Sequence, residues 1–348
     1  MAIKNILTVD VEDWYHICDI EHVLPPSSWD RCENRILFNM EKILALFGRF
    51  KVKATFFVLG YVAERTPEVV RMIEGEGHEI ASHGYGHVQV FKQTKDEFLQ
   101  DLLRSKGLLE NMTGDKVIGY RAPQWSICGG KRDSRWALDL LARNGFLYDS
   151  SIAPLRFIGI PDAPAIPYAV ATPHGDIKEF PPLVMRFPLG NLPIGGGWGL
   201  RIFPYRSIRR RIEELNRHGY PALIFCHPSD FDTFRSPVRL PWIKRFVCYG
   251  KIKTTEERMI RLLNDFEFIS IKEFIYSKEN KIPIQNAPLT LPISPMRLCR
   301  NGGNGKNVML NLFQHLINSM SYETLNQVQG DEKAIATQPP WGEGGGEG

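Results

Sequence analysis

The sequence lacks the cysteine spacing of a zinc ribbon and the cysteine density of a disulfide scaffold. Its six cysteines are scattered over 348 residues without a C-x2-C pair, a pattern typical of a reducing compartment. The N-terminus shows no basic segment followed by an apolar stretch, so we expect no signal peptide. No apolar run approaches the roughly 20 residues that a membrane-spanning helix needs. These absences predict a soluble, cytoplasmic protein.

The sequence also carries little net charge. Lysine and arginine number 43 against 39 aspartates and glutamates, which gives a formal net charge of +4. This excess is too small to indicate a nucleic-acid partner. A basic cluster at Arg206 and residues 209–211 is interpreted as the solvated face of a helix, with an anion or membrane-surface contact as the alternative. The hydrophobic content of 43% is sufficient for a globular core.

Strand and helix patterns alternate along most of the chain. Short apolar runs rich in β-branched residues predict buried strands at 6–11, 54–60, 78–82, 117–120, 145–151, 221–228 and 266–270. Amphipathic spacing predicts helices at about 34–50, 67–76, 95–112, 135–144, 208–218 and 255–264. This alternation is typical of a parallel α/β fold, in which functional residues collect at the carboxyl ends of the strands.

Two stretches depart from the alternation. Residues 154–205 are rich in proline and glycine, and we expect an ordered insertion that faces a substrate. Within it Trp198, Phe203 and Tyr205 either stack on a sugar ring or belong to the core. Beyond about residue 281 the sequence is polar and glycine-rich. We therefore expect a catalytic domain over 1–280 and a low-order tail over 281–348.

Two histidines follow the predicted strand at 78–82. His83 and His87 are separated by Gly, Tyr and Gly, and this spacing lets both imidazoles turn toward one point. The glycines favour a loop that leaves room for a ligand. The pair predicts a metal site, with surface histidines beside a glycine-rich turn as the alternative.

Three carboxylates stand at the end of the first predicted strand. Asp10, Glu12 and Asp13 are costly to gather unless a cation or an arginine balances them. Strand alternation places Asp10 and Glu12 on one side, and Asp13 is able to swing in if the strand ends there. A solvated turn from strand to loop is the alternative.

Three further polar residues follow other predicted strands. Arg121 has the geometry to hold a carboxylate through two parallel hydrogen bonds, Asp149 is an acid near a strand end, and His227 follows the buried run at 221–226. Singly, Arg121 is compatible with an ordinary strand exit and His227 with a satisfied core histidine. Their common position at strand ends predicts one site together with the carboxylates and the histidine pair.

With these strand ends in order, the chain resembles the NodB-like polysaccharide deacetylases, carbohydrate esterase family 4. More narrowly, it resembles the branch found with bacterial exopolysaccharide and exosortase loci. The resemblance covers about residues 5–275. It rests on five ordered motifs, TVDVED at 8–13, HGYGH at 83–87, RAP at 121–123, YDSS at 148–151 and IFCHP at 224–228. The resemblance implies a distorted, incomplete (β/α) barrel of the NodB-homology type.

The resemblance also implies a metal centre. His83 and His87 would be ligands of Zn²⁺ or of another divalent transition metal, with Glu12 as the acidic ligand and Asp13 as the alternative. Most family members have two adjacent aspartates in the first motif, whereas here a valine follows Asp10. Glu12 is favoured because it shares a strand face with Asp10, which would be the general base.

Roles for the remaining motif residues follow from the same resemblance. His227 would protonate the leaving amine, Arg121 would hold the base, and Asp149 would orient His227 or Arg121. The turn formed by Pro123, Gln124 and Trp125 would contact the substrate, with a backbone N–H near Gln124 stabilising the oxyanion.

The implied function is metal-dependent hydrolysis of acetyl groups, chiefly N-acetyl, from a polysaccharide or oligosaccharide in exopolysaccharide metabolism. The alternatives are an allantoinase-like hydrolase of a small cyclic amide and a non-catalytic sugar-binding module of the same fold. A pure binder has no need for a base, an acid and a metal together, which argues against the last.

Overall fold

The computed structural model describes residues 3–188, 190–234 and 238–277. Its centre is one sheet built from the strands β1 (Asn5–Val11), β2 (Thr55–Val58), β3 (Glu79–Ser82), β4 (Gly119–Tyr120), β5 (Tyr148–Asp149), β6 (Tyr168–Val170), β7 (Ile177–Glu179), β10 (Leu223–Cys226) and β11 (Phe268–Ile269). The strand order is β10-β1-β2-β3-β4-β5-β7-β6, and β11 pairs with the start of β1. All neighbours are parallel except β6 and β7. Within the described residues β6 and β10 do not pair, so the barrel is incomplete, as predicted.

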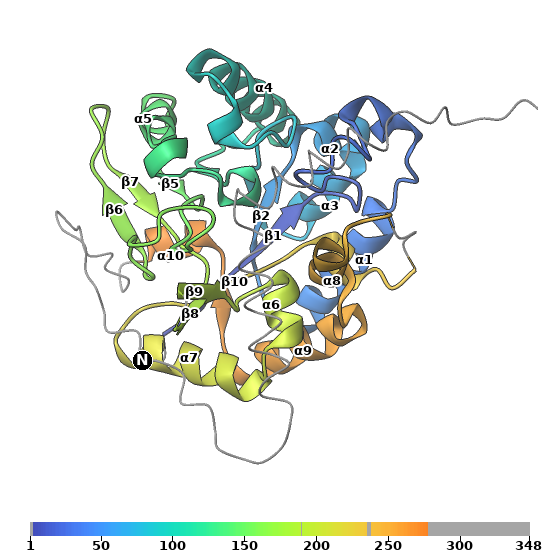
Figure 1. The fold of residues 1–348 in the computed structure, drawn as a ribbon, viewed down its shortest axis with the longest axis vertical. Helices are drawn as coiled ribbons and strands as arrows, with labels where there is room; N and C mark the ends of the chain where they lie inside the picture. The colour runs from blue at the N-terminus through green and yellow to red at the C-terminus, as the bar shows by residue number, and fades with distance from the viewer. Residues whose placement is uncertain (1–2, 189, 235–237, 278–348) are drawn as a thin grey trace, which may run out of the picture. The chain divides into compact units, whose positions relative to one another are not determined.

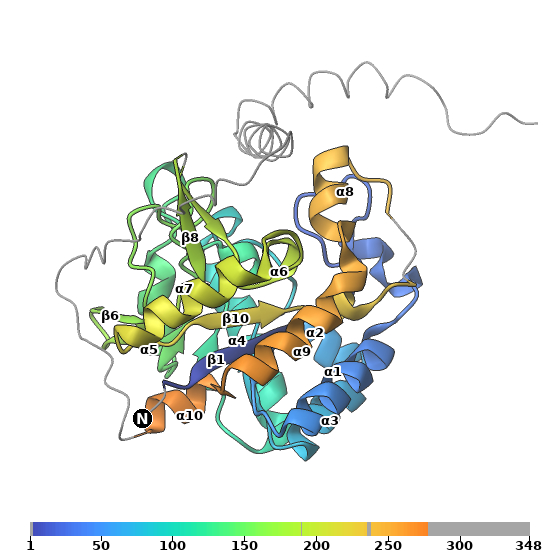
Figure 2. The ribbon, with the colours of Figure 1, turned by 90° about the horizontal axis from the view of Figure 1, so that it is seen from below.

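Helices surround these strands (Figure 1). They are α1 (Ile36–Phe50), α2 (Gly60–Arg65), α3 (Pro67–Gly75), α4 (Lys95–Thr113), α5 (Trp136–Arg143), α6 (Gly197–Ile202), α7 (Tyr205–Arg217), α8 (Trp242–Tyr249), α9 (Thr255–Asp265) and α10 (Ile271–Tyr276). Short 3-10 helices lie at η1 (Pro26–Arg31), η2 (Val90–Lys92), η3 (Pro123–Trp125), η4 (Gly130–Arg132), η5 (Pro228–Phe231) and η6 (Ile252–Thr254). Figure 2 shows α1 and α3 on one side of β1 and β10, and α7 on the other.

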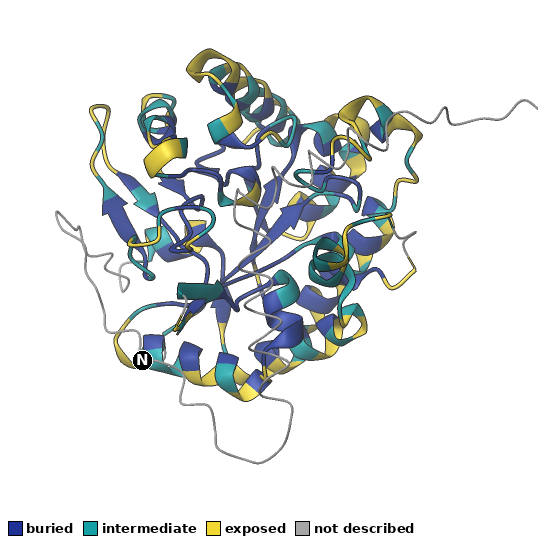
Figure 3. Cartoon of the chain, viewed as in Figure 1, coloured by how far each residue is buried: buried dark blue, intermediate teal, exposed yellow. Residues whose placement is uncertain are grey.

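The core lies along the central strands. Every residue of β1 is buried, which fits its place between β10 and β2. Figure 3 shows the central strands as buried and the outward faces of the helices as exposed. Because β1, β2, β3 and β10 are parallel and adjacent, the loops after them meet at one edge of the sheet.

The proline-rich stretch at 154–205 is only partly an insertion. Strands β6 and β7 lie within it and extend the main sheet, while β8 (Val184–Phe187) and β9 (Gly190–Pro193) form a separate antiparallel pair. Phe203 and Tyr205 are buried in the core, and the half-buried ring of Trp198 packs 5.9 Å from that of Phe203. Of the two roles expected for these rings, stacking on a sugar or packing in the core, Phe203 and Tyr205 therefore have the second.

The remaining expectations from the sequence concern the basic cluster, the cysteines, membrane-spanning helices and the C-terminal tail. In the basic cluster on α7, Arg206, Arg209 and Arg210 are exposed, whereas Arg211 is buried and pairs with Glu214 at 2.9 Å. The five described cysteines are free. Among the described helices none has the length and apolarity to cross a bilayer. The tail expected at 281–348 lies outside the described residues.

Candidate active site

A buried arginine organises the acidic end of β1. Arg121, which is 1% exposed, donates from Nη1 to Oδ1 of Asp10 at 2.5 Å and to Oγ1 of Thr8 at 2.9 Å. Its Nη2 donates to Oγ of Ser150 at 2.8 Å, and its guanidinium carbon lies 4.1 Å from the centre of the Phe57 ring. These contacts fix the guanidinium, so Asp10 is held in one orientation beside a permanent positive charge.

Glu12, His83 and His87 converge beside Asp10. One ligand atom from each lies within 4.8 Å of the other two. Nδ1 of His83 donates to the carbonyl of Arg121 at 2.8 Å, which leaves Nε2 for a ligand. Oε2 of Glu12 and Nε2 of His87 lie only 2.6 Å apart, yet both atoms are buried and their geometry makes no hydrogen bond. A cation between them would satisfy both, and two imidazoles with one carboxylate suit zinc.

The protonation states of Glu12 and His83 suit a cation. His87 differs, because burial opposes its positive charge but Glu12 and Cys18 raise its pKa well above the ordinary value, so a bound metal would have to displace a proton from it. Burial alone would raise the pKa of Glu12, but the charge and proximity of His87, followed by His227 and His83, lower it to about 2. Burial lowers the pKa of His83 to about 4. At neutral pH Glu12 is therefore anionic and His83 neutral, and these are the forms that bind metals.

The loop that carries the two histidines is shaped by an acid that the sequence analysis missed. Asp101 of α4 accepts hydrogen bonds from the backbone N–H groups of Tyr85 and Gly86, both at 2.8 Å. Gly84 has φ +74°, and a Cβ there would lie 2.8 Å from Oδ1 of Asp101. The thiol of Cys18 lies 3.6 Å from Nδ1 of His87. No sequence periodicity marks Asp101, since it acts on a loop from the face of a helix.

Asp13, the alternative acidic ligand, is engaged elsewhere. Its Oδ1 accepts from the backbone N–H of Trp14 at 2.7 Å, and its Oδ2 accepts from that of Arg35 at 2.8 Å. Burial raises the pKa of Asp13 to about 6, although these hydrogen bonds lower it in part. The carboxylate thus orders the chain after β1, and the geometry favours Glu12 for the metal.

His227 faces the carboxylates from the end of β10. Its Nε2 lies 3.3 Å from Oε1 of Glu12 and 3.8 Å from Oδ2 of Asp10. Oδ2 of Asp230 lies 3.0 Å from Nδ1 of His227 and accepts the backbone N–H of His227 at 3.0 Å. Burial opposes a positive charge on His227, but Asp230, then Glu12 and Asp10, outweigh it and raise the pKa to about 9. Asp230 was missed in the sequence, although an acid three residues after His227 with an intervening proline is typical of a capping turn.

The expected role of Asp149 is not supported. Asp149 is fully buried and accepts hydrogen bonds from the hydroxyl and backbone N–H of Ser151. The group that orients His227 is Asp230, and Arg121 is held by Ser150. The hydrogen bonds of Asp149 come from Ser151, and its carboxyl group interacts with Glu179 on the neighbouring strand β7.

The turn after Arg121 has an unusual backbone. Gln124 and Trp125, which follow Pro123, both lie in the left-handed region with φ of 55° and 50°, a conformation that costs energy for residues other than glycine. The Trp125 ring packs edge-to-face on Phe225 at 4.8 Å. Backbone strain of this kind clusters at functional sites. The substrate contacts expected of Pro123, Gln124 and Trp125 remain predictions.

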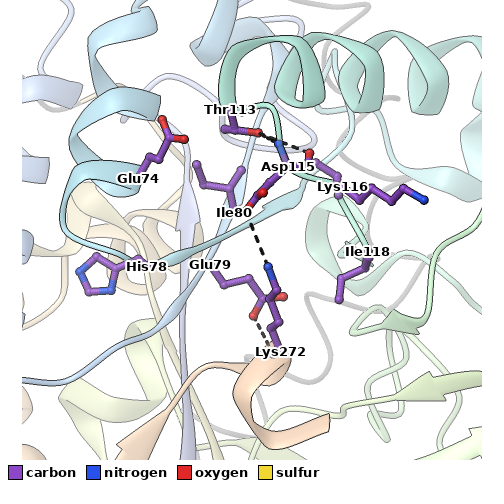
Figure 4. A pocket seen from close by; sticks show the side chains of 10 residues that line it. Glu74, His78, Glu79, Ile80, Thr113, Asp115, Lys116, Ile118 and Lys272 are labelled. Carbon is purple, nitrogen blue, oxygen red and sulfur yellow. Dashed lines mark hydrogen bonds and ion pairs between the residues drawn. The ribbon is translucent and has the colours of Figure 1, made fainter. Parts of the chain in front are cut away.

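A small cavity lies at the other end of the sheet (Figure 4). Its volume is about 40 Å³, and Glu79 and Lys272 are among the residues that line it. Glu79 begins β3, whereas His83 follows its last residue. The cavity is separate from the residues described above.

Two family models match the chain, one on each side of residue 140. "Polysaccharide deacetylase" matches residues 29–138, and "Domain of unknown function (DUF3473)" matches residues 150–276. This chain contains a NodB-type (CE4) polysaccharide deacetylase domain. The crystal structure of a candidate polysaccharide deacetylase from Mycobacterium smegmatis shares the fold, with a TM-score of 0.53 and 22% identity over 82% of this chain and 95% of that one.

Curated relatives of the deacetylase domain match only part of the chain. A peptidoglycan deacetylase of Helicobacter pylori is 34% identical over 111 residues, which are 32% of this chain and 36% of that protein. A peptidoglycan-N-acetylglucosamine deacetylase of Bacillus cereus is 34% identical over 98 residues, 28% of this chain and 35% of that one. The matched region thus spans about a third of the length of these relatives.

Proposed function

We propose that this domain is a metal-dependent deacetylase that hydrolyses an N-acetyl group on a polysaccharide or oligosaccharide, in exopolysaccharide metabolism. The observation that carries the proposal is one edge of the sheet where a base candidate, an acid candidate and three candidate metal ligands meet. Nε2 of His227 lies 3.8 Å from Oδ2 of Asp10 and 3.3 Å from Oε1 of Glu12. The peptidoglycan deacetylases among the relatives support an acetylated glycan as the substrate class.

Glu12, His83 and His87 would hold the metal. When bound, zinc would supply a Lewis acid that polarises the acetyl carbonyl and acidifies water. Asp10 accepts the proton of the attacking water, and Arg121 keeps its carboxylate aimed at that proton. A backbone N–H near Gln124 would stabilise the charge that develops on the acetyl oxygen.

His227 completes the reaction as the acid. An amide nitrogen leaves poorly without a proton, and His227 donates one from Nε2 while Asp230 holds Nδ1. The raised pKa of His227 favours the protonated form that this step needs.

The test is release of acetate from N-acetylhexosamine oligomers and polymers, with and without a chelator, beside allantoin as a cyclic amide. We expect chelator-sensitive acetate release from at least one glycan. Hydrolysis of allantoin alone would replace the proposal with an allantoinase-like activity. Glycan binding without any hydrolysis would leave a sugar-binding module.

A further inference from the structure

The part of the chain matched by the domain of unknown function contributes a second buried arginine next to the site. Arg201 of α6 is 1% exposed and donates from Nη1 to Oδ1 of Asp230. The other oxygen of that carboxylate receives both the ring and the backbone N–H of His227. Asp230 is therefore held from one side by Arg201 and holds His227 from the other.

A glycine-rich approach brings α6 close enough for this contact. Residues 195–197 are all glycine, and Gly196 forms a parallel bridge with Phe225, two residues before His227. A Cβ on Gly196 would lie 2.2 Å from the carbonyl oxygen of Phe225, and one on Gly199 would lie 2.0 Å from that of Pro193. No side chain fits at either position without displacing backbone, so the glycines set the distance between Arg201 and the end of β10.

The second amino group of Arg201 reaches a different element. Nη2 donates to the carbonyls of Val247 at 2.6 Å and Cys248 at 3.4 Å, near the end of α8. Nε of Arg201 is buried without a hydrogen-bond partner. The guanidinium is therefore held by Asp230 and the end of α8, and it fixes the carboxylate relative to that helix.

We propose that Arg201 is a positioning residue of the reaction, which fixes Asp230 and through it the ring of His227. The inference rests on the proposed function, because it gives His227 the role of the acid. Arg201 itself lies behind Asp230, so it acts through the carboxylate and touches no substrate. A buried carboxylate that lost its arginine would turn toward other donors, and the ring of His227 would lose its fixed orientation.

The test compares Arg201→Met with Arg211→Met in the full-length, zinc-loaded protein. Arg211 is a matched control, since it is 6% exposed, pairs with a carboxylate at 2.9 Å and donates to the carbonyl of Val184 at 3.3 Å, away from the site. We expect Arg201→Met to lower kcat by about 10- to 100-fold with KM within about twofold. Arg201→Lys should recover part of the loss, and Arg211→Met should keep kcat near the wild-type value.

A second readout does not depend on activity. The Nδ1–H proton of His227, assigned by its loss in His227→Gln, should give a resolved low-field NMR resonance in wild type and in Arg211→Met. We expect it to be lost or shifted in Arg201→Met and, if that variant fails to fold, shifted in Arg201→Lys. An unchanged resonance with unchanged kcat, or equal losses in the two methionine variants, would overturn the proposal. If wild type releases no acetate from any glycan, the proposed function fails, and the resonance alone decides whether Arg201 positions His227.

Discussion

Two buried carboxyl groups beside the site make stability depend on pH. Asp149 and Glu179 are fully buried and occupy paired positions on β5 and β7. The backbone N–H of Ile152 donates to Oε1 of Glu179 at 3.0 Å. Burial raises the pKa of Asp149 to about 6, and burial together with the charge of Asp149 raises the pKa of Glu179 well above its ordinary value. The charge of Arg121 lowers the pKa of Glu179 only in part.

The direction of the pH effect follows from these shifts. In the unfolded chain both groups lose their protons near pH 4, at about their ordinary pKa values. The folded protein keeps protons that the unfolded chain has released, so stability is fully present below about pH 4 and is lost as the pH rises through the folded pKa values. Each retained proton lowers the free energy of unfolding by about 1.4 kcal/mol per pH unit. Since Asp149 titrates near pH 6, Glu179 alone continues this loss of stability above pH 6, until the pH reaches its own raised pKa.

Replacing Glu179 with Gln removes this cost. The amide keeps an oxygen for the N–H of Ile152 and a donor for Asp149, but it has no proton to lose. We expect Glu179→Gln to match wild type near pH 4 and to exceed it by about 1.4 kcal/mol more for each further pH unit over which the folded wild type keeps the Glu179 proton. Each kcal/mol corresponds to roughly 2–4 °C in Tm for a domain of 150–250 residues, and to less for a larger one.

Urea and thermal unfolding, followed by circular dichroism from pH 5 to 8, would measure the difference. Glu257→Gln, at a carboxylate whose side chain is 71% exposed on α9, serves as the control and should follow wild type across the range. Parallel curves for Glu179→Gln and wild type between pH 6 and 8 would refute the reasoning, because they would show that Glu179 holds no extra proton in the folded state.

Three further predictions concern the site and its support. Asp10→Asn should lower kcat for acetate release at least about 100-fold through loss of the base, with zinc content by mass spectrometry unchanged; loss of zinc would make Asp10 a ligand. Glu12→Gln should weaken zinc binding at least about 10-fold, whereas Asp13→Asn should keep zinc and lower Tm, and the reverse pattern would exchange their roles. Gly196→Ala should lower Tm because its Cβ meets backbone at 2.2 Å, while Gly107→Ala, with nothing within 4 Å, should be neutral or stabilising by up to about 1 kcal/mol; equal Tm values would contradict the close approach.

The polar residues that end the strands could be predicted to meet because the geometry of a parallel sheet is general. Register pairs such as Val9 with Cys226 place the ends of β1 and β10 side by side, although they are far apart in sequence. The supporting acids Asp101 and Asp230 could not be predicted in the same way. They act from a helix face and from a turn, where only the packed structure decides which side chains touch.

The pairing of Asp149 with Glu179 could not be predicted from the sequence for a related reason. Strand β5 has two residues and β7 has three, too few for alternation to show which way a side chain points. The proline-rich sequence around β6 and β7 also hid two strands of the main sheet. Asp149 was therefore assigned to the site by its place in a motif, whereas its cross-strand neighbour is Glu179.

The two family models do not correspond to two separate structural domains. Strand β10, within residues 150–276, pairs with β1 from Ile6 to Val9, and β11 pairs with the first two residues of β1. Residues 29–138 include both histidines of the candidate metal site, but the candidate acid and its support from Arg201 lie beyond residue 150. A fragment that ended before residue 150 would expose one edge of β1 and lack His227. The segment of unknown function is thus the half of the sheet that carries the acid, and the reaction proposed for the chain requires both halves.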